Sequence, residues 1–567
     1  MAKVTDETAS ALAELARRIG ELERRVLALE KTPPAVPSAS IPSTQESKSP
    51  QPPLVSVPAG TISILGRAVL GMAVAYLFRA ASEYAILPRP LLVIAAILYS
   101  ALWLLLSVRL RPSEGFARAV YALTAVLILS PLLWEATVRF HILSPMAAAC
   151  ALTVFMIFGL VLSLRFDLRA APPILLFFAV PTAVVLVIGT GAVTPFAFSL
   201  LAIGLTVEVA ACRGNWPYLR PIIAAAADFI IWLTAFLLAR PEGPPSSYFP
   251  ADKSSLVMLP VALFVVYGAS TAYRTIVRLI PITIFEIAQL PAAFILATTG
   301  VAAATASAAI PALGAFALVL ATACYLAAFL RFQQEGQKRN FVVFSVYSAA
   351  LFVIGIWLLF PQKTQAALFC LAAVVTMFFA TSKKITLLRY QASVYLFGAL
   401  LAGGFFPFTA HAFVGANPGA ITWTIGAETL TALICYMAAW NLAGRGWKDH
   451  LLSFFPMILA AAALAGSAVI LLVGFVAGRT PPVAHALAVI RTTIICASAL
   501  AFGLLAVRFK RVELVWAAYG ALAFGTVKLL VEDLWLERKE WLAVSLFFYG
   551  LVLILLPRIL RRVPKRT

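Results

Sequence analysis

The sequence predicts an all-α polytopic membrane protein with about 18 transmembrane helices, preceded by a short coiled coil. Of the 567 residues, 62% are hydrophobic and only 12% are charged, whereas a soluble domain carries roughly 25% charged residues. Apolar runs of about 20 residues, the length that crosses a bilayer as a helix, recur from Thr61 onward and are joined by short connections. Because a helix satisfies its backbone hydrogen bonds without water, we expect helices and no strands.

Residues 1–31 are predicted to form a cytoplasmic coiled coil. They are rich in charge and lack the apolar core of a secretory signal. Their apolar residues are spaced alternately three and four apart, which is the heptad pattern. The expected seam consists of Leu12, Leu15, Ile19, Leu22, Val26 and Leu29. Through residues 12–29 the chain would form a homodimer or bind a partner helix; the alternative is a solitary amphipathic helix lying on the membrane or on the protein's own loops.

Two polar segments flank the predicted transmembrane domain, residues 61–559. Residues 32–60 hold eight prolines among Ser, Gln and Lys, a composition typical of a disordered linker because it cannot bury a core. Residues 560–567 are a basic tail that we expect in the cytoplasm.

Eighteen apolar segments are expected to span the membrane. They are residues 62–82, 88–108, 117–134, 143–164, 171–189, 192–212, 220–239, 255–277, 281–303, 308–330, 340–360, 363–381, 384–404, 419–441, 450–476, 482–507, 512–531 and 540–559. Lys and Arg concentrate in alternate loops, which predicts that these loops and both termini are cytoplasmic. One split or fused span is an open alternative around residues 171–212, where two short segments adjoin.

The formal net charge of +20 is explained by this topology rather than by nucleic acid, because the basic residues lie in small groups between spans. Membrane lipids are the expected partners. The six cysteines and four histidines are scattered without C-x-x-C or H-E-x-x-H spacing, so the sequence indicates no metal or cofactor site. No catalytic residue is assigned, and an enzyme is not favoured.

Ionisable residues within apolar spans are costly and are functional candidates by default. The candidate site residues are Arg79, Glu83, Asp228, Glu286, Glu428, Arg491, Lys528 and Asp533. A mixed-charge patch that opens outward is expected from five of them, Arg79, Glu83, Glu428, Arg491 and Lys528. Asp228 and Glu286 are expected toward the cytoplasmic half. The structural alternative is that Arg79 and Lys528 only anchor helix ends at the membrane surface, and that the deeper charges only pair between helices.

Two segments resemble a bacterial multi-span membrane protein family of unknown function, whose members have a coiled coil, a proline-rich linker and a long series of transmembrane helices. LGRAVLGMAVAYLFRAASEYAIL (residues 65–87) is similar to the opening span of that family, and GALAFGTVKLLVEDL (residues 520–534) to its closing K-L-x-x-x-D-L pattern. ITWTIGAETLTAL (residues 421–433) resembles a third segment, with a wider gap between Trp423 and Glu428. The resemblance implies a bacterial cytoplasmic membrane location, supplies no activity, and favours a functional or assembly role for Lys528 with Asp533.

Three function classes fit these patterns. A transporter or flippase-like protein for a polar or lipid-linked envelope molecule is favoured by the many spans, short loops and rare buried charges. An envelope scaffold is favoured by the coiled coil and linker. A glycosyltransferase using a lipid-linked donor ranks third, because Glu83 and Glu135 stand in suitable outer loops but lack a paired acidic motif.

Overall fold

The computed structural model consists of two compact units, residues Met1–Ile62 and Ser63–Thr567. It describes residues 17–18, 20–21, 59–83, 88–238, 245, 248, 253–305, 307–414, 419–440, 447–477, 484–533 and 539–561. All six residues of the expected coiled-coil seam lie outside these ranges, as does most of the expected linker. The following paragraphs concern the second unit.

Long helices account for nearly all of this unit, and the described residues contain no strand. The helices are α2 (Ala59–Glu83), α3 (Arg89–Arg109), α4 (Gly115–Trp134), α5 (Pro145–Arg165), α6 (Ala171–Thr190), α7 (Val193–Cys212), α8 (Arg220–Leu238), α9 (Lys253–Ala272), α10 (Ile284–Ala304), α11 (Ile310–Leu326), α12 (Lys338–Leu359), α13 (Gln362–Lys383), α14 (Thr386–Gly403), α15 (Phe405–Phe413), α16 (Trp423–Trp440), α17 (Trp447–Ala477), α18 (Ala484–Phe509), α19 (Val512–Val531) and α20 (Lys539–Leu560). Three π-helical segments, η1 (Glu135–Arg139), η3 (Tyr273–Val277) and η4 (Ala327–Phe332), extend α4, α9 and α11.

The helices confirm the predicted all-α polytopic class. Sixteen described helices are long and apolar enough to cross a membrane, and the bent pair α14 and α15 brings the number to 17 if it is one span. The 18-residue helix α16, which carries Glu428, falls outside that set. Counting α16 as well gives the expected eighteen. The segments around residues 171–212 form two helices, α6 and α7, so the alternative of a fused span there is wrong.

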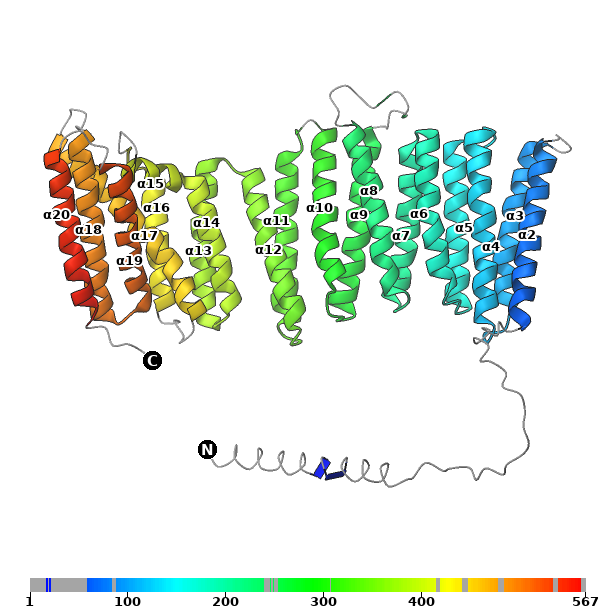
Figure 1. Ribbon diagram of the computed structural model, residues 1–567, viewed down its shortest axis with the longest axis horizontal. Coiled ribbons are helices and arrows are strands. Elements are labelled where there is room, and N and C mark those ends of the chain that lie inside the picture. The colour runs from blue at the N-terminus through cyan, green and yellow to red at the C-terminus, as the bar shows by residue number, and fades with distance from the viewer. Residues whose placement is uncertain are drawn as a thin grey trace, which may run out of the picture. The chain divides into compact units, whose positions relative to one another are not determined.

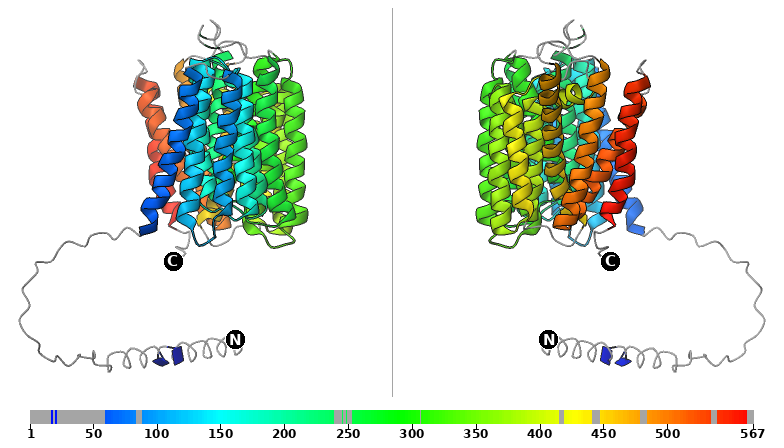
Figure 2. Two further views of the ribbon diagram at one scale, coloured as in Figure 1. Left: turned by 90° about the vertical axis from the view of Figure 1, so that its right-hand side faces the viewer. Right: turned by 90° about the vertical axis from the view of Figure 1, so that its left-hand side faces the viewer.

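The helices lie side by side and advance along the chain from α2 at one end to α20 at the other, except that α18 rather than α19 is the neighbour of α20 (Figure 1). We call the side on which α2 starts and α20 ends the proximal side, and the other the distal side. Figure 2 shows from two further directions that α20 ends on the side from which α2 rises. This arrangement requires an even number of crossings. The distal side corresponds to the predicted outer surface.

Alanine fills much of the core between neighbouring helices. Ala122, Ala179, Ala227, Ala373 and Ala499 are all fully buried. Small residues let helix backbones approach closely, which is how helices associate where lipid is as apolar as the side chains. Close packing fixes the rotation of each helix, and this rotation decides which charged side chains meet.

Candidate functional site

The helix that begins as α14 is broken near its distal end. It stops at Gly403, and α15 leaves at an angle of 67°. Gly404 between them has a φ of +86°, in the left-handed region that glycine adopts without steric cost. The chain then makes only nine helical residues before α15 ends at Phe413. The sequence analysis took residues 384–404 as a simple span and did not predict this break.

Glu428 lies against the break. It sits in the first half of α16, is 1% exposed, and neither of its carboxyl oxygens has a hydrogen-bond partner in the described part of the chain. A Cβ atom added at Gly403 would stand 1.4 Å from Glu428 Oε1, so only glycine allows this approach. One turn before Glu428, the Thr424 hydroxyl donates to the Gly403 carbonyl oxygen at 3.0 Å. Thus α16 holds the hinge by one hydrogen bond and by packing.

Arg491 of α18 holds the other end of α15. Its Nε donates to the carbonyl oxygen of Ala412 at 2.7 Å and its Nη2 to that of His411 at 2.9 Å. Its Nη1 pairs with Glu532 Oε1 at 2.7 Å. The last carbonyls of a helix lack partners within the helix, and the helix dipole favours a cation there. A buried acid therefore lies against the hinge that precedes the short helix and a buried cation binds the end of that helix, and both side chains are 1% exposed.

Lys528 continues the network from Arg491. Its Nζ donates to Ala488 O at 2.6 Å and to Thr492 Oγ1 at 2.7 Å, and it forms ion pairs with Asp533 and, at 3.5 Å, with Glu532. The Thr492 hydroxyl donates to Asp533 Oδ2 at 2.8 Å. We call Arg491, Thr492, Lys528, Glu532 and Asp533 the distal charge network. Lys528 is 3% exposed and Asp533 is fully buried, so Lys528 points into the bundle rather than to the membrane surface.

A second charge network joins α7, α8, η3 and α10 at their proximal ends. Arg220 binds Glu208 and Glu286, each at 2.8 Å, and Arg274 reaches Glu286 at 3.0 Å. The Ser270 hydroxyl donates to Glu208. All four charged side chains are at most 7% exposed. The positive charges of the two arginines balance the negative charges of the two carboxylates, as buried ion pairs that pack helices together require in a medium of low polarity.

The remaining candidates near this network have ordinary roles. Glu286 also closes a capping box at the start of α10 with Thr283. Asp228, half-buried on α8, accepts a hydrogen bond from Gln289 Nε2 at 2.9 Å. The sequence analysis missed Arg220 and Arg274 because each stands next to a predicted loop, where basic residues are explained by topology.

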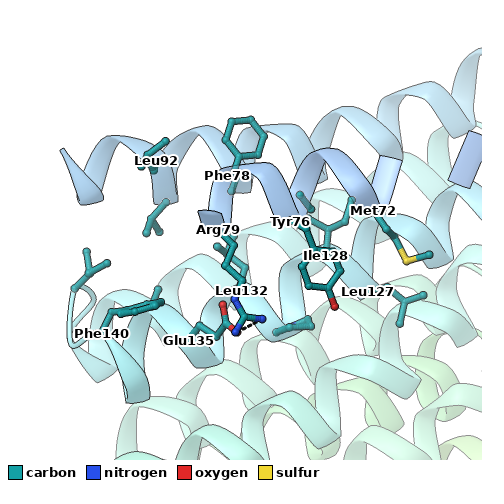
Figure 3. Close-up of a pocket in the computed structure, with 16 residues that line it drawn as sticks. Met72, Tyr76, Phe78, Arg79, Leu92, Leu127, Ile128, Leu132, Glu135 and Phe140 are labelled. Atoms are coloured by element: carbon teal, nitrogen blue, oxygen red, sulfur yellow. Dashed lines mark ion pairs between the residues drawn. The ribbon is translucent and has the colours of Figure 1, made fainter. Parts of the chain in front are cut away.

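Arg79 belongs to a third place in the fold. Its Nη1 pairs with Glu135 Oε1 at 2.8 Å where η1 prolongs α4, beside a cavity of about 280 Å³ (Figure 3). Tyr76, Phe78 and Phe140 line that cavity together with aliphatic side chains. Because α2 and α4 lie at the opposite end of the helix series from α18 and α19 (Figure 1), the expectation of one outward patch joining Arg79 to Arg491 and Lys528 is wrong. The side chain of Glu83 lies outside the described residues.

No family model, curated protein or solved structure matches this chain. Among the described residues, no three His, Cys, Asp or Glu side chains come together as a metal site. The broken helix between Glu428 and Arg491 is therefore the candidate site, and its chemistry is the binding of charge at the two ends of one short helix.

Proposed function

We propose that this protein is a transporter or flippase-like protein of the bacterial cytoplasmic membrane, with both termini cytoplasmic, that moves a polar or lipid-linked envelope molecule. The observation that carries the proposal is α15, a short helix set at 67° to α14, with a buried acid packed against the hinge between them and a buried arginine at the end of α15. Transporters commonly place such interrupted helices at their substrate and ion sites.

Non-helical backbone is costly within a membrane. Each unsatisfied backbone group costs several kcal/mol in hydrocarbon, so breaks are tolerated only where protein or water covers them. Here Arg491 satisfies two carbonyls of α15, and Thr424 satisfies the Gly403 carbonyl. A rigid framework would gain more from an unbroken helix. The chain instead has a glycine hinge, and its free carbonyl groups are bonded by side chains of other helices. This combination favours an element that moves.

The cavity beside Arg79 supports the choice of a lipid-linked cargo. It has an ion pair in its wall, between Phe140 on one side and Tyr76 on the other, and is otherwise lined mainly by aromatic and aliphatic side chains, which suits a molecule with a polar head and a hydrocarbon chain (Figure 3). A second cavity of about 290 Å³ between α9, α10, α11 and α12 is lined almost wholly by apolar side chains. Both are suited to hydrocarbon.

The test is a flipping assay in proteoliposomes that contain fluorescently labelled phosphatidylglycerol as the probe. We expect the wild-type protein to bring probe from the inner leaflet to the outer leaflet, where dithionite quenches it. Arg491→Leu should abolish this activity while inserting to the same level, because α15 loses its anchor. Arg331→Leu is the control, since Arg331 is exposed, pairs with the exposed Glu335 and makes only a long hydrogen bond of 3.5 Å to the Ile276 carbonyl.

Two outcomes would count against the proposal. One is wild-type flipping no faster than in protein-free liposomes. The other is equal activity in Arg491→Leu and Arg331→Leu, which would separate the flipping from the candidate site.

A further inference from the structure

Glu428 differs from the other buried carboxylates in the described residues. Glu208 and Glu286 face arginines, Asp533 faces Lys528, and Glu513 lies 3.0 Å from His450 and 3.8 Å from Arg511. For Glu428, no cation lies within ion-pairing distance and no donor satisfies either oxygen, within the part of the chain that the structure describes. An ionised carboxylate in that position would be buried without compensation, so the neutral acid is the stable form.

The surroundings supply no charge that would keep Glu428 ionised. On α13, the buried Cys370 near the carboxyl group carries no positive charge in either protonation state of its thiol. On α14, Tyr395 and Arg389 lie 8 and 14 residues before Gly403, which is about 12 and 21 Å along a helix. On α15 and α17, His411 and His450 stand at the ends that are remote from the hinge.

We propose that Glu428 is the proton-binding group of this protein and that its protonation state sets the position of α15. The proposal deepens the proposed function, on which it rests, by naming the coupling ion. One O–H bond forms at the Glu428 carboxyl group when a proton is taken up from water, and the same bond breaks when the proton is released. No other bond changes.

The coupling follows from the place of Glu428 at the hinge. The first N–H groups of a helix have no partners within the helix and carry its positive dipole end. Glu428 packs against Gly403, where the carbonyl end of α14 meets the N–H end of α15. An ionised carboxylate at this junction is repelled by the first and attracted by the second, whereas the neutral acid acts on the junction only by packing. Because Gly404 is the joint, the short helix tightens on deprotonation and loosens on protonation.

A proton suits the space better than a metal cation. Glu428 Oε1 is packed so closely against Gly403 that even a methyl group would not fit between them. A proton adds almost no volume, whereas a sodium ion must be surrounded by several oxygen ligands. Sodium dependence is therefore an outcome that the experiment must be able to reveal.

The first measurement is infrared difference spectroscopy of the reconstituted protein between about pH 5 and about pH 9, which brackets the range in which buried carboxyl groups titrate. We expect a band of protonated carboxyl that disappears at high pH in the wild type and is weaker in Glu428→Gln by the contribution of one group; Asp228→Asn separates any contribution of the half-buried Asp228. Glu335→Gln is the matched control because Glu335 is exposed and should leave the band unchanged.

The second measurement is hydrogen exchange of the peptide covering α15, compared between wild type and Glu428→Gln at each pH. The two should exchange alike at low pH, and at high pH the wild type should exchange roughly 2- to 30-fold more slowly, the range for a charge at a helix N-terminus. Gln is close to Glu in size, so a folding defect is not expected; a wild-type melting temperature verifies this.

Three results would overturn the inference. These are a carboxyl band of the same intensity in Glu428→Gln as in the wild type, an exchange difference independent of pH, and a band that responds to sodium but not to pH. Neither measurement uses a transported molecule. If Glu428 titrates but the protein does not flip the probe, the proposed function is rejected and the proton site remains. If the protein flips the probe but Glu428 does not titrate, only the proton site is rejected.

Discussion

Replacing Gly403 with alanine should destabilise the hinge, and the structure gives the size of the effect. The new methyl group would stand 1.4 Å from Glu428 Oε1 and 2.6 Å from its Cδ. Ordinary contact begins near 3.5 Å, so the carboxyl group must move by about 2 Å. Overpacking of this kind costs about 1–3 kcal/mol. The better helix propensity of alanine returns up to about 1 kcal/mol of this.

The matched control is Gly426→Ala, two residues before Glu428 on α16. A Cβ at Gly426 meets nothing within 4 Å, so this change should be neutral or stabilise the protein by up to about 1 kcal/mol. The rescue is Glu428→Ala, which removes the carboxyl group that Gly403→Ala meets. In the double variant the two effects should couple by about 1–3 kcal/mol, because the residues are in direct contact.

The assay is reversible unfolding in mixed micelles, with the free energy of unfolding measured for the wild type, the two single variants and the double variant. Equal stability of Gly403→Ala and Gly426→Ala would refute the close approach of Glu428 to the hinge. Additive effects in the double variant would refute the direct contact.

Three further predictions concern other parts of the protein. Arg220→Leu should lower the free energy of unfolding by about 3–5 kcal/mol because it leaves the buried Glu208 without its cation and Glu286 with Arg274 alone, whereas Arg331→Leu should change it by less than about 1 kcal/mol because its ion pair is exposed. Asn340→Ala should cost about 1–3 kcal/mol, since the buried Asn340 amide accepts from one backbone N–H and donates to one carbonyl in the connection before α10; the same unfolding assay measures all three variants. Deleting residues 1–31 should leave flipping of the phosphatidylglycerol probe unchanged, and a loss of flipping with normal insertion would favour the scaffold hypothesis instead.

The number and position of the spans could be predicted because the requirement for about 20 apolar residues is a property of the solvent. The break at Gly403 and Gly404 could not be separated from a continuing span, since residues 405–413 are as apolar as their neighbours. Its local signals were two consecutive glycines, Gly403 and Gly404, followed by Pro407 in the first turn of α15. Glycines also occur within helices, for example Gly300 in α10, where the helix continues unbroken.

The candidate charges could be found from the sequence, but their partners could not. Lys528 and Asp533 are five residues apart, and their pairing was suggested by the motif that contains them. Arg491 instead binds backbone carbonyls, which leave no mark in a sequence. Arg79 meets Glu135 because η1 carries α4 one turn further than the apolar run. Which side chains pair depends on how each helix is rotated and on which helices lie beside it, and both are decided by packing.

Motion of α15 is the point on which the account depends, and a distance measurement tests it directly. Phe406 on α15 and Trp357 at the distal end of α12 are both exposed, so each can carry a spin label after replacement by cysteine in a chain whose six native cysteines are removed. In liposomes we expect two distances whose proportions shift between acidic and alkaline pH, and a single, pH-independent distance in Glu428→Gln. One unchanging distance in the wild type at both pH values would contradict the account.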